Sequence, residues 1–270
     1  MSNAQDRTPS TADRGVWGES DADIWERRFE LQRTPLFDAV LESIDVESGM
    51  TLLDAGCGGG GLALAAYRTG ARVFGCDISE GMLTRARHKV PAGEFRVADI
   101  AALPYADDSF DRVVACDCLL SVRDGHAQKA VRELSRVGKP TGSLCLVIWE
   151  EPRKSALSRV VTAIHKLSPT PPPVSPLALS AEGVFDALLR EVGLRMRTDR
   201  TVRVTYRFAT FDDFWSVWSV FGGIKLITDA VGESRVSNAV REAIQPSIRS
   251  NGELVMDNAW RLVVVSTKPV

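Results

Sequence analysis

Residues 51–61 read Thr-Leu-Leu-Asp-Ala-Gly-Cys-Gly-Gly-Gly-Gly, and this stretch is the most informative part of the chain about its fold. Its first half is a short apolar run that predicts a buried strand. Its second half places five glycines within six positions, and apolar residues at helical spacing follow from Leu62 onward. The order of strand, glycine turn and helix is typical of the first unit of a nucleotide-binding α/β domain. Glycine suits the turn because the chain bends sharply there and a ligand can approach bare backbone.

The spacing Gly56-x-Gly58-x-x-Gly61 also matches the dinucleotide fingerprint, so the glycines alone do not identify the ligand. The choice between the possible ligands depends on Asp54. Asp54 ends the predicted strand two residues before the first glycine, and we expect its side chain to face the ligand. A carboxylate at that point repels a pyrophosphate group and attracts a ligand that carries positive charge without phosphate. S-adenosylmethionine, with its sulfonium and ammonium groups, is such a ligand. A nicotinamide oxidoreductase is the alternative that rests on the glycines alone.

Two stretches resemble one known family. Residues 53–60 (Leu-Asp-Ala-Gly-Cys-Gly-Gly-Gly) resemble the first motif of class I S-adenosylmethionine-dependent methyltransferases. Residues 103–111 (Leu-Pro-Tyr-Ala-Asp-Asp-Ser-Phe-Asp) resemble a turn found in the small-molecule, type-11-like members of that class. The resemblance implies an α/β, Rossmann-like fold with a seven-stranded mixed sheet, helices on both faces, an antiparallel last strand and helical cap insertions. It also implies S-adenosylmethionine as cofactor, bound in part by Gly56, Cys57 and Gly58.

Asp77 is the second carboxylate that the pattern assigns to the cofactor. Residues 72–77 predict the second strand, and Asp77 ends it 21 residues after Gly56. That spacing suits a carboxylate that accepts hydrogen bonds from both ribose hydroxyls. Ser79 can cap the following helix, which leaves Asp77 for the ribose; the alternative is that Asp77 itself is the cap. Ile78 is expected to pack on the adenine ring.

The third and fourth predicted strands end in further candidate cofactor residues. Residues 95–98 predict the third strand, which runs into Asp99 and Ile100. The resemblance implies that Asp99 accepts a hydrogen bond from the adenine amino group and that the Ile100 N–H meets the ring, with a plain turn role as the alternative for Asp99. Residues 112–116 predict the fourth strand, and Asp117 follows at its carboxyl end, where open parallel sheets bind ligands. A backbone carbonyl near Asp117 is expected to meet the methionine ammonium group.

The expected domain organisation follows from changes in composition along the chain. The first residues are polar, a proline-rich run interrupts the second half, and the last strands are separated by an insertion. We expect a disordered N-terminus (1–13), N-terminal lid helices with the cofactor-binding core (14–150), an accessory helix with a proline-rich connector (151–180), the C-terminal part of the core (181–208 and 259–270) and a helical cap insertion (209–258).

Aromatic residues supply the candidates for substrate contact. Phe214, Trp215 and Trp218 share one face of a predicted helix in the insertion. They predict an apolar roof over a hydrophobic substrate; the alternative is that they fasten the insertion to the domain. Two N-terminal tryptophans either form a lid or anchor packing, and a third ends the fifth strand. The candidates are Trp17, Trp25, Trp149, Phe214, Trp215 and Trp218.

The sequence identifies no clear catalytic residue. Methyl transfer from a sulfonium is an in-line displacement that depends mainly on positioning, and a general base is needed only where the nucleophile must lose a proton. His165 and Glu150 are the two candidates for that base, whereas His88 and His126 are expected on the surface. The missing base also favours an alternative, a relative that uses S-adenosylmethionine in a cyclisation or rearrangement. A binding module without catalysis is a third possibility, against which the intact cofactor motifs argue.

Composition excludes several classes of partner. The 270 residues include 33 Lys and Arg against 35 Asp and Glu, a net charge of −2, so no basic field attracts nucleic acid. The five cysteines are odd in number and indicate free thiols in a reducing compartment, without metal-ligand spacing. No apolar run is long enough to span a membrane, and the N-terminus lacks a signal-like apolar region. We therefore expect a cytoplasmic monomer or homodimer that acts on a small-molecule substrate, with no metal, nucleic acid or membrane.

Overall fold

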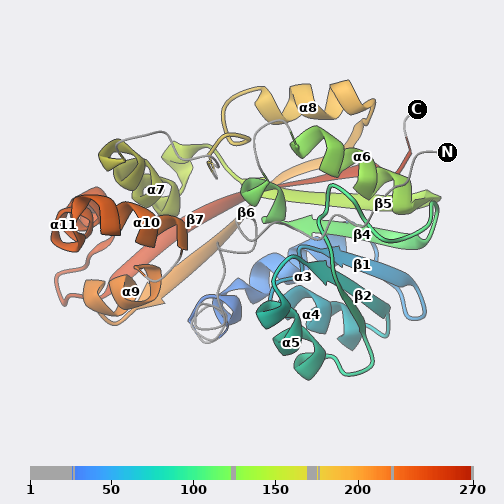
Figure 1. The fold of residues 1–270 in the computed structure, drawn as a ribbon, viewed down its shortest axis with the longest axis horizontal. Coiled ribbons are helices and arrows are strands. Elements are labelled where there is room, and N and C mark those ends of the chain that lie inside the picture. Colours follow the sequence, from blue (N-terminus) through green and yellow to red (C-terminus); the bar gives the residue numbers. More distant parts are fainter. Residues whose placement is uncertain are drawn as a thin grey trace.

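A single seven-stranded sheet forms the centre of the protein (Figure 1). The computed structural model describes residues 26, 28–122, 126–168, 175, 177–219 and 222–268. The strand order is β3-β2-β1-β4-β5-β7-β6; the first five strands run parallel, and β7 is antiparallel to both β5 and β6. The predicted fold class is therefore confirmed. The strands are β1 (Thr51–Ala55), β2 (Arg72–Asp77), β3 (Glu94–Val97), β4 (Phe110–Cys116), β5 (Gly138–Trp149), β6 (Met196–Phe208) and β7 (Leu254–Ser266).

Helices cover both faces of this sheet. Successive strand residues point to opposite faces, so Leu52 lies in the hydrophobic cluster on one side and Leu53 in the cluster on the other. Burial on both faces explains why the inner parallel strands are almost entirely apolar. The helices on one face are α3 (Thr34–Ser43), α4 (Gly61–Arg68) and α5 (Glu80–Lys89), and those on the other are α6 (Ala127–Val137) and α8 (Val184–Val192). In Figure 1 the first group lies below the sheet and the second above it.

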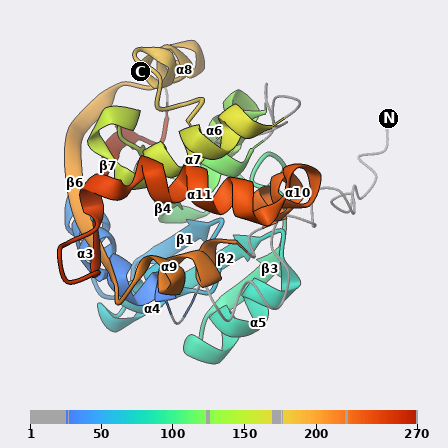
Figure 2. The same cartoon turned by 90° about the vertical axis from the view of Figure 1, so that its left-hand side faces the viewer.

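A cap of helices stands beyond the carboxyl ends of the parallel strands. Residues 260–266 of β7 pair with β5, whereas residues 254–259 pair with β6 alone, so the β6–β7 hairpin extends past the end of β5. Figure 2 shows α10 and α11 crossing in front of these strand ends. The cap helices are α7 (Ala156–Leu167), α9 (Phe211–Trp218), α10 (Gly222–Val231) and α11 (Glu233–Ala243), with short 3₁₀ turns η3 (Pro152–Lys154) and η4 (Gln245–Ser247).

The last strand begins at Leu254, five residues before the predicted start at Ala259, so the boundary placed at residue 259 is wrong. Polar residues hide the strand pattern there. Asp257 accepts a cross-strand hydrogen bond from Thr205 (2.7 Å). Asn258 is buried, and its Oδ1 accepts from the backbone N–H of Leu157 (2.9 Å) in the first turn of α7. Both side chains satisfy tertiary partners, which a local alternation pattern does not reveal.

Two local features differ from what their residue types suggest. Residues 139–142, which include Pro140 and Gly142, form no separate turn but lie inside β5 as a bulge, because the pairing shifts from Phe110–Gly138 to Arg112–Ser143. Thr34 does not cap α3. The 3₁₀ helix η1 (Glu30–Arg33) runs directly into α3, which leaves Thr34 as its first residue.

Several expectations fall outside the described residues. They concern Trp17, Trp25, the polar N-terminus and most of the proline-rich connector. Within the described ranges, no helix combines the length and the apolar character needed to cross a bilayer.

Candidate active site

The glycine loop between β1 and α4 forms the floor of the candidate site. Gly56 and Gly58 have positive φ angles of 72° and 51°, which favour glycine. A Cβ on Gly56 would lie 2.2 Å from the Cβ of Cys118, so this glycine serves close packing within the protein. A Cβ on Gly58 would meet nothing within 4 Å. Gly58 is thus the part of the loop that leaves bare backbone open to a ligand.

Asp54 is a buried carboxylate with an unsatisfied oxygen. It lies in β1, is 2% exposed, and its Oδ2 has no hydrogen-bond partner among the residues that the structure describes. Burial raises the pKa of Asp54 to about 7, and the negative charges of Asp77 and Glu30 add to the rise. An unpaired buried carboxylate is costly, and a cation beside it removes the cost. This arrangement fits the ammonium and sulfonium groups of S-adenosylmethionine.

Asp77 ends β2 and holds the glycine loop. Its two carboxylate oxygens accept hydrogen bonds from the backbone N–H groups of Gly58 and Ser79, both at 2.9 Å. Burial raises the pKa of Asp77, and these two hydrogen bonds oppose the rise. Ser79 Oγ accepts from the Met82 N–H (3.3 Å) and caps α5, as the sequence predicts. The ribose contact of Asp77 and the adenine contact of the half-buried Ile78 stay predictions.

Asp99 and Ile100 follow β3 at the outer edge of the sheet. Asp99 is exposed, and its Oδ1 accepts from the Ala101 N–H (2.8 Å), which is the turn contact named above as the alternative. Ile100 is buried in the hydrophobic cluster above the sheet. The turn contact uses only one oxygen of Asp99, so it is compatible with a ligand contact through the other. The contacts of Asp99 and Ile100 with adenine stay predictions.

Asp117 follows β4 and carries a buried ion pair. Its φ of 63° is left-handed, which is uncommon for a residue other than glycine and typical of functional sites. Oδ2 lies 2.5 Å from Arg33 Nη2 and accepts from the indole N–H of Trp260 (2.9 Å). Burial raises the pKa of Asp117, and the Arg33 charge opposes that rise. The ion pair brings the N-terminal segment to the end of β4.

Two site residues, Glu30 and Arg33, were not identified from the sequence. Both lie in η1, which crosses from the glycine loop to the end of β4. Glu30 accepts from the Gly61 N–H (2.9 Å) at the start of α4 and forms an ion pair with Lys89 at the end of α5. The only sequence feature that links Glu30 and Arg33 is their spacing of three residues, which places them on one helical turn. No neighbouring residue predicts their partners.

The predicted aromatic stripe is buried in the cap. Phe214, Trp215 and Trp218 are at most 8% exposed. Phe214 stacks on Trp218 with ring centroids 5.5 Å apart, and Phe29 of the N-terminal segment meets Trp218 at 6.1 Å. These contacts fasten the cap to the N-terminal segment, the alternative given above. A substrate contact by this stripe, or by the half-buried Trp149 at the end of β5, stays a prediction.

The two candidate bases differ in environment. His165 is half-buried on α7, and burial lowers its pKa, so the ring is neutral at pH 7. Glu150 is 8% exposed, and its carboxylate accepts from Thr201 Oγ1 (2.6 Å) and lies 3.4 Å from Lys154 Nζ. Its pKa is lowered: burial acts to raise it, but these hydrogen bonds and the Lys154 charge outweigh burial. Glu150 is therefore held as an anion, and its lowered pKa makes this carboxylate a weak base.

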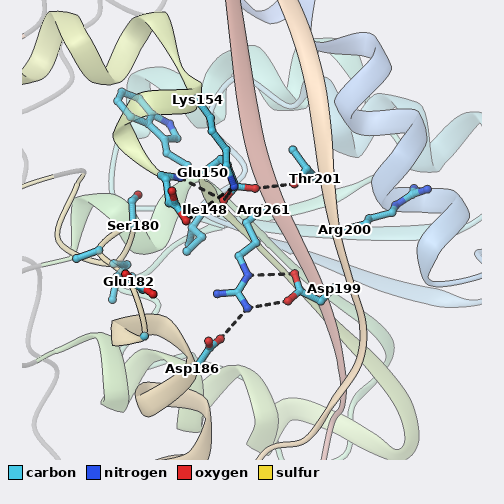
Figure 3. Close-up of a pocket in the computed structure, with 15 residues that line it drawn as sticks. Ile148, Glu150, Lys154, Ser180, Glu182, Asp186, Asp199, Arg200, Thr201 and Arg261 are labelled. Carbon is cyan, nitrogen blue, oxygen red and sulfur yellow. Dashed lines mark hydrogen bonds and ion pairs between the residues drawn. The ribbon is translucent and has the colours of Figure 1, made fainter.

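Glu150 lines a polar cavity of about 370 Å³ between β5, β6 and α8 (Figure 3). Arg261 points into the same region and forms ion pairs with Asp186 and Asp199, both at 2.7 Å. The charged groups drawn in Figure 3 thus largely satisfy one another.

Comparison with known proteins agrees with this geometry. Residues 53–146 match the family model described as "Methyltransferase domain". "Methyltransferase GfsG" of Streptomyces halstedii is 38% identical over 116 residues, which cover 40% of this chain and 41% of that protein. A "Demethylmenaquinone methyltransferase" of Corynebacterium efficiens is 35% identical over 130 residues, 48% of this chain and 50% of that protein. The matches span about half the length of these curated relatives.

Solved structures share the fold at low sequence identity. A putative methyltransferase from Bacillus halodurans aligns with a TM-score of 0.60 at 17% identity, over 87% of this chain and 99% of that one. The [4+2]-cyclase SpnF aligns with a TM-score of 0.57 at 22% identity, over 95% of this chain and 88% of that one. The family match, the open glycine loop and the unsatisfied Asp54 carboxylate agree with one another: residues 53–146 match a methyltransferase domain of the class I S-adenosylmethionine-dependent type, and S-adenosylmethionine is the cofactor that fits this site.

Proposed function

We propose that this protein transfers a methyl group from S-adenosylmethionine to an oxygen, carbon or nitrogen atom of a small, apolar organic molecule. The observation that carries the proposal is the Asp54 carboxylate, buried without a partner for Oδ2 beside the open Gly58 backbone. A cationic ligand without phosphate satisfies that carboxylate, whereas a pyrophosphate would be repelled by it.

The bound cofactor supplies an activated methyl group on a positively charged sulfur. Asp54 and a backbone carbonyl near Asp117 would hold the charged methionine end, and Asp77 and Asp99 would hold the ribose and the adenine. The N-terminal segment and the cap exclude water from the ends of the parallel strands. Positioning of this kind can supply roughly 7–11 kcal/mol of a bimolecular barrier, so the reaction does not depend on a strong base. His165, neutral at pH 7, is the better candidate where an acceptor must lose a proton.

An apolar acceptor is supported by two observations. The cap that stands over the strand ends is rich in aromatic side chains, among them Phe214 and Trp218. Three relatives of the chain, from Corynebacterium efficiens, Paenarthrobacter aurescens and Streptomyces griseus, are named as demethylmenaquinone methyltransferases, which supports a small organic acceptor here as well.

A second candidate function is a cyclisation or rearrangement in a pocket that S-adenosylmethionine helps to shape. The [4+2]-cyclase SpnF shares the fold, and Glu150, one of the two candidate bases, is held as an anion. Transfer of radiolabel from methyl-labelled S-adenosylmethionine to an acceptor library of quinols, phenols and amines separates the two: labelled product supports methyl transfer, and conversion of a substrate without label supports the second function.

Thermal unfolding with S-adenosylmethionine, S-adenosylhomocysteine or NADH tests the cofactor site directly. A ligand at a hundred times its dissociation constant adds about 2.7 kcal/mol, or roughly 5–10 °C at about 2–4 °C for each kcal/mol. We expect this shift with the two adenosyl ligands, and its loss in Asp77→Ala. A shift with NADH alone would overturn the proposal.

We also propose a cytoplasmic enzyme that is a monomer or a homodimer. Its five cysteines are all free thiols, which supports a reducing compartment. Fractionation of the native host and light scattering of the purified protein test these two statements.

A further inference from the structure

Glu30 places a third carboxylate against the glycine loop. The loop motif itself does not predict this contact. The Glu30 side chain is 7% exposed, and Oε1 would lie 3.3 Å from a Cβ on Gly59. The same oxygen accepts from the Gly61 N–H (2.9 Å), so the carboxylate lies across the last half of the loop. Its negative charge also acts on Asp54, whose pKa it helps to raise. Glu30 is therefore electrostatically part of the cofactor site.

Lys89 provides the opposing charge. It comes from the end of α5, forms an ion pair with Glu30 and lies 3.4 Å from Glu26. Two further cations near the loop have carboxylate partners of their own, since Arg33 pairs with Asp117 and Arg85 with Glu26. Among the residues that the structure describes, the carboxylates of Asp54, Asp77 and Glu30 are then opposed by the Lys89 ammonium group alone. This surplus of negative charge lies where burial weakens the screening by water.

The reaction changes the charge of the cofactor by one unit. When a lone pair of the acceptor atom forms a bond to the methyl carbon, the bond between that carbon and sulfur breaks, its electron pair stays on sulfur, and the sulfonium becomes a neutral thioether. A site with surplus negative charge therefore holds the methyl donor more tightly than its demethylated product, other contacts being equal. The size of that preference depends on each charge near the loop.

We propose that Glu30 is a specificity-determining residue that makes the cofactor site prefer the cationic methyl donor over its neutral product, with Lys89 setting the size of the preference. This inference rests on the proposed function. Its consequence is release of product driven by loss of charge, because the favourable interaction with Glu30 disappears once the sulfonium is neutral.

The simpler alternative is that the Glu30–Lys89 pair only fastens η1 to α4 and α5. Two substitutions separate these roles. Glu30→Gln keeps an oxygen for the Gly61 N–H, removes one negative charge and leaves Lys89 with Glu26 as its ion-pair partner. Lys89→Gln removes the Glu30–Lys89 ion pair as well, together with the contact to Glu26, but takes away a positive charge. Both variants lose the Glu30–Lys89 contact and change the local charge in opposite directions.

Isothermal titration calorimetry at pH 8 measures the dissociation constants of S-adenosylmethionine and S-adenosylhomocysteine for each variant. We expect the preference for the methyl donor to fall by about three- to tenfold in Glu30→Gln and to rise by a similar factor in Lys89→Gln. Lys225→Gln and Asp229→Asn are the matched controls, since they remove an exposed ion pair (2.9 Å) within α10 and should leave the ratio unchanged.

The outcomes separate an electrostatic role of Glu30 from a purely structural one. Opposite changes of the ratio support the inference. Equal losses of affinity for both ligands, or changes in the same direction in both variants, show that the pair is only a fastener and overturn the inference while the cofactor assignment holds. A wild-type protein that binds neither ligand overturns the proposed function and the inference together.

Discussion

Replacing Asp54 by asparagine should stabilise the cofactor-free protein and abolish its function. Burial keeps the Asp54 carboxyl protonated up to about pH 7 in the folded protein, whereas its ordinary pKa is 3.8. Between these two values the folded state binds more protons than the unfolded state, so the free energy of unfolding falls as pH rises and then levels off above pH 7. The difference corresponds to about 4 kcal/mol, at about 1.4 kcal/mol for each pKa unit.

Asp54→Asn removes this loss of stability because asparagine never ionises. At pH 8 we expect the variant to be more stable than the wild type by about 2–4 kcal/mol, or roughly 4–16 °C in Tm, since the new amide also needs partners. At pH 4 the two proteins should unfold at nearly the same temperature, because the wild-type carboxyl is then protonated in the folded state. Chemical and thermal denaturation across pH 4–8 measure the difference.

The reasoning would be refuted by a variant that is no more stable than the wild type at pH 8, or by a gain that does not depend on pH. Asp229→Asn, an exposed carboxyl in α10, is the control and should show no such trend. In the wild type, the affinity for S-adenosylmethionine should increase as pH rises to about 7, because the cation binds the ionised form of Asp54. Asp54→Asn should bind weakly at every pH.

Three further predictions concern positions where the structure assigns a distinct role. Asn258→Ala removes the buried amide that caps α7 and should lower the free energy of unfolding by about 1–3 kcal/mol in urea denaturation; an unchanged midpoint would contradict the cap. Gly56→Ala should prevent folding or cost several kcal/mol because its Cβ meets another side chain at 2.2 Å. Gly58→Ala meets no atom, so it should cost only about 1–2 kcal/mol for its left-handed φ of 51° and should lose cofactor affinity; the reverse order would contradict the roles of the two glycines. Arg33→Met leaves the Asp117 carboxylate buried without its counter-charge and should cost about 3–5 kcal/mol by the same assay, with a smaller loss at pH 4 than at pH 7, where the carboxyl is charged.

Local sequence patterns predicted the elements whose stabilising partners are near in the chain. The second strand was predicted to the residue, Arg72–Asp77, and the helix after it begins at Glu80, directly after the predicted Ser79 cap. The Ser79 cap lies three residues from the N–H that it accepts, so its role is visible in the sequence. The start of the last strand was missed because Asp257 and Asn258 interrupt the apolar alternation, and their partners lie 52 and 101 residues away.

The candidate site divides in the same way. The parallel α/β sheet, the glycine loop and the carboxylates at the strand ends could be predicted from the residues, because strand, turn and cap signals act over a few residues and parallel strands bring their carboxyl ends together. Folding of the whole chain was needed to show that Glu30 reaches the loop across 31 residues, that Arg33 neutralises Asp117 across 84, and that Trp260 completes that contact across 143. Charge pairing and burial depend on which distant segments pack together, and this packing also leaves Asp54 with an unsatisfied oxygen in the cofactor site.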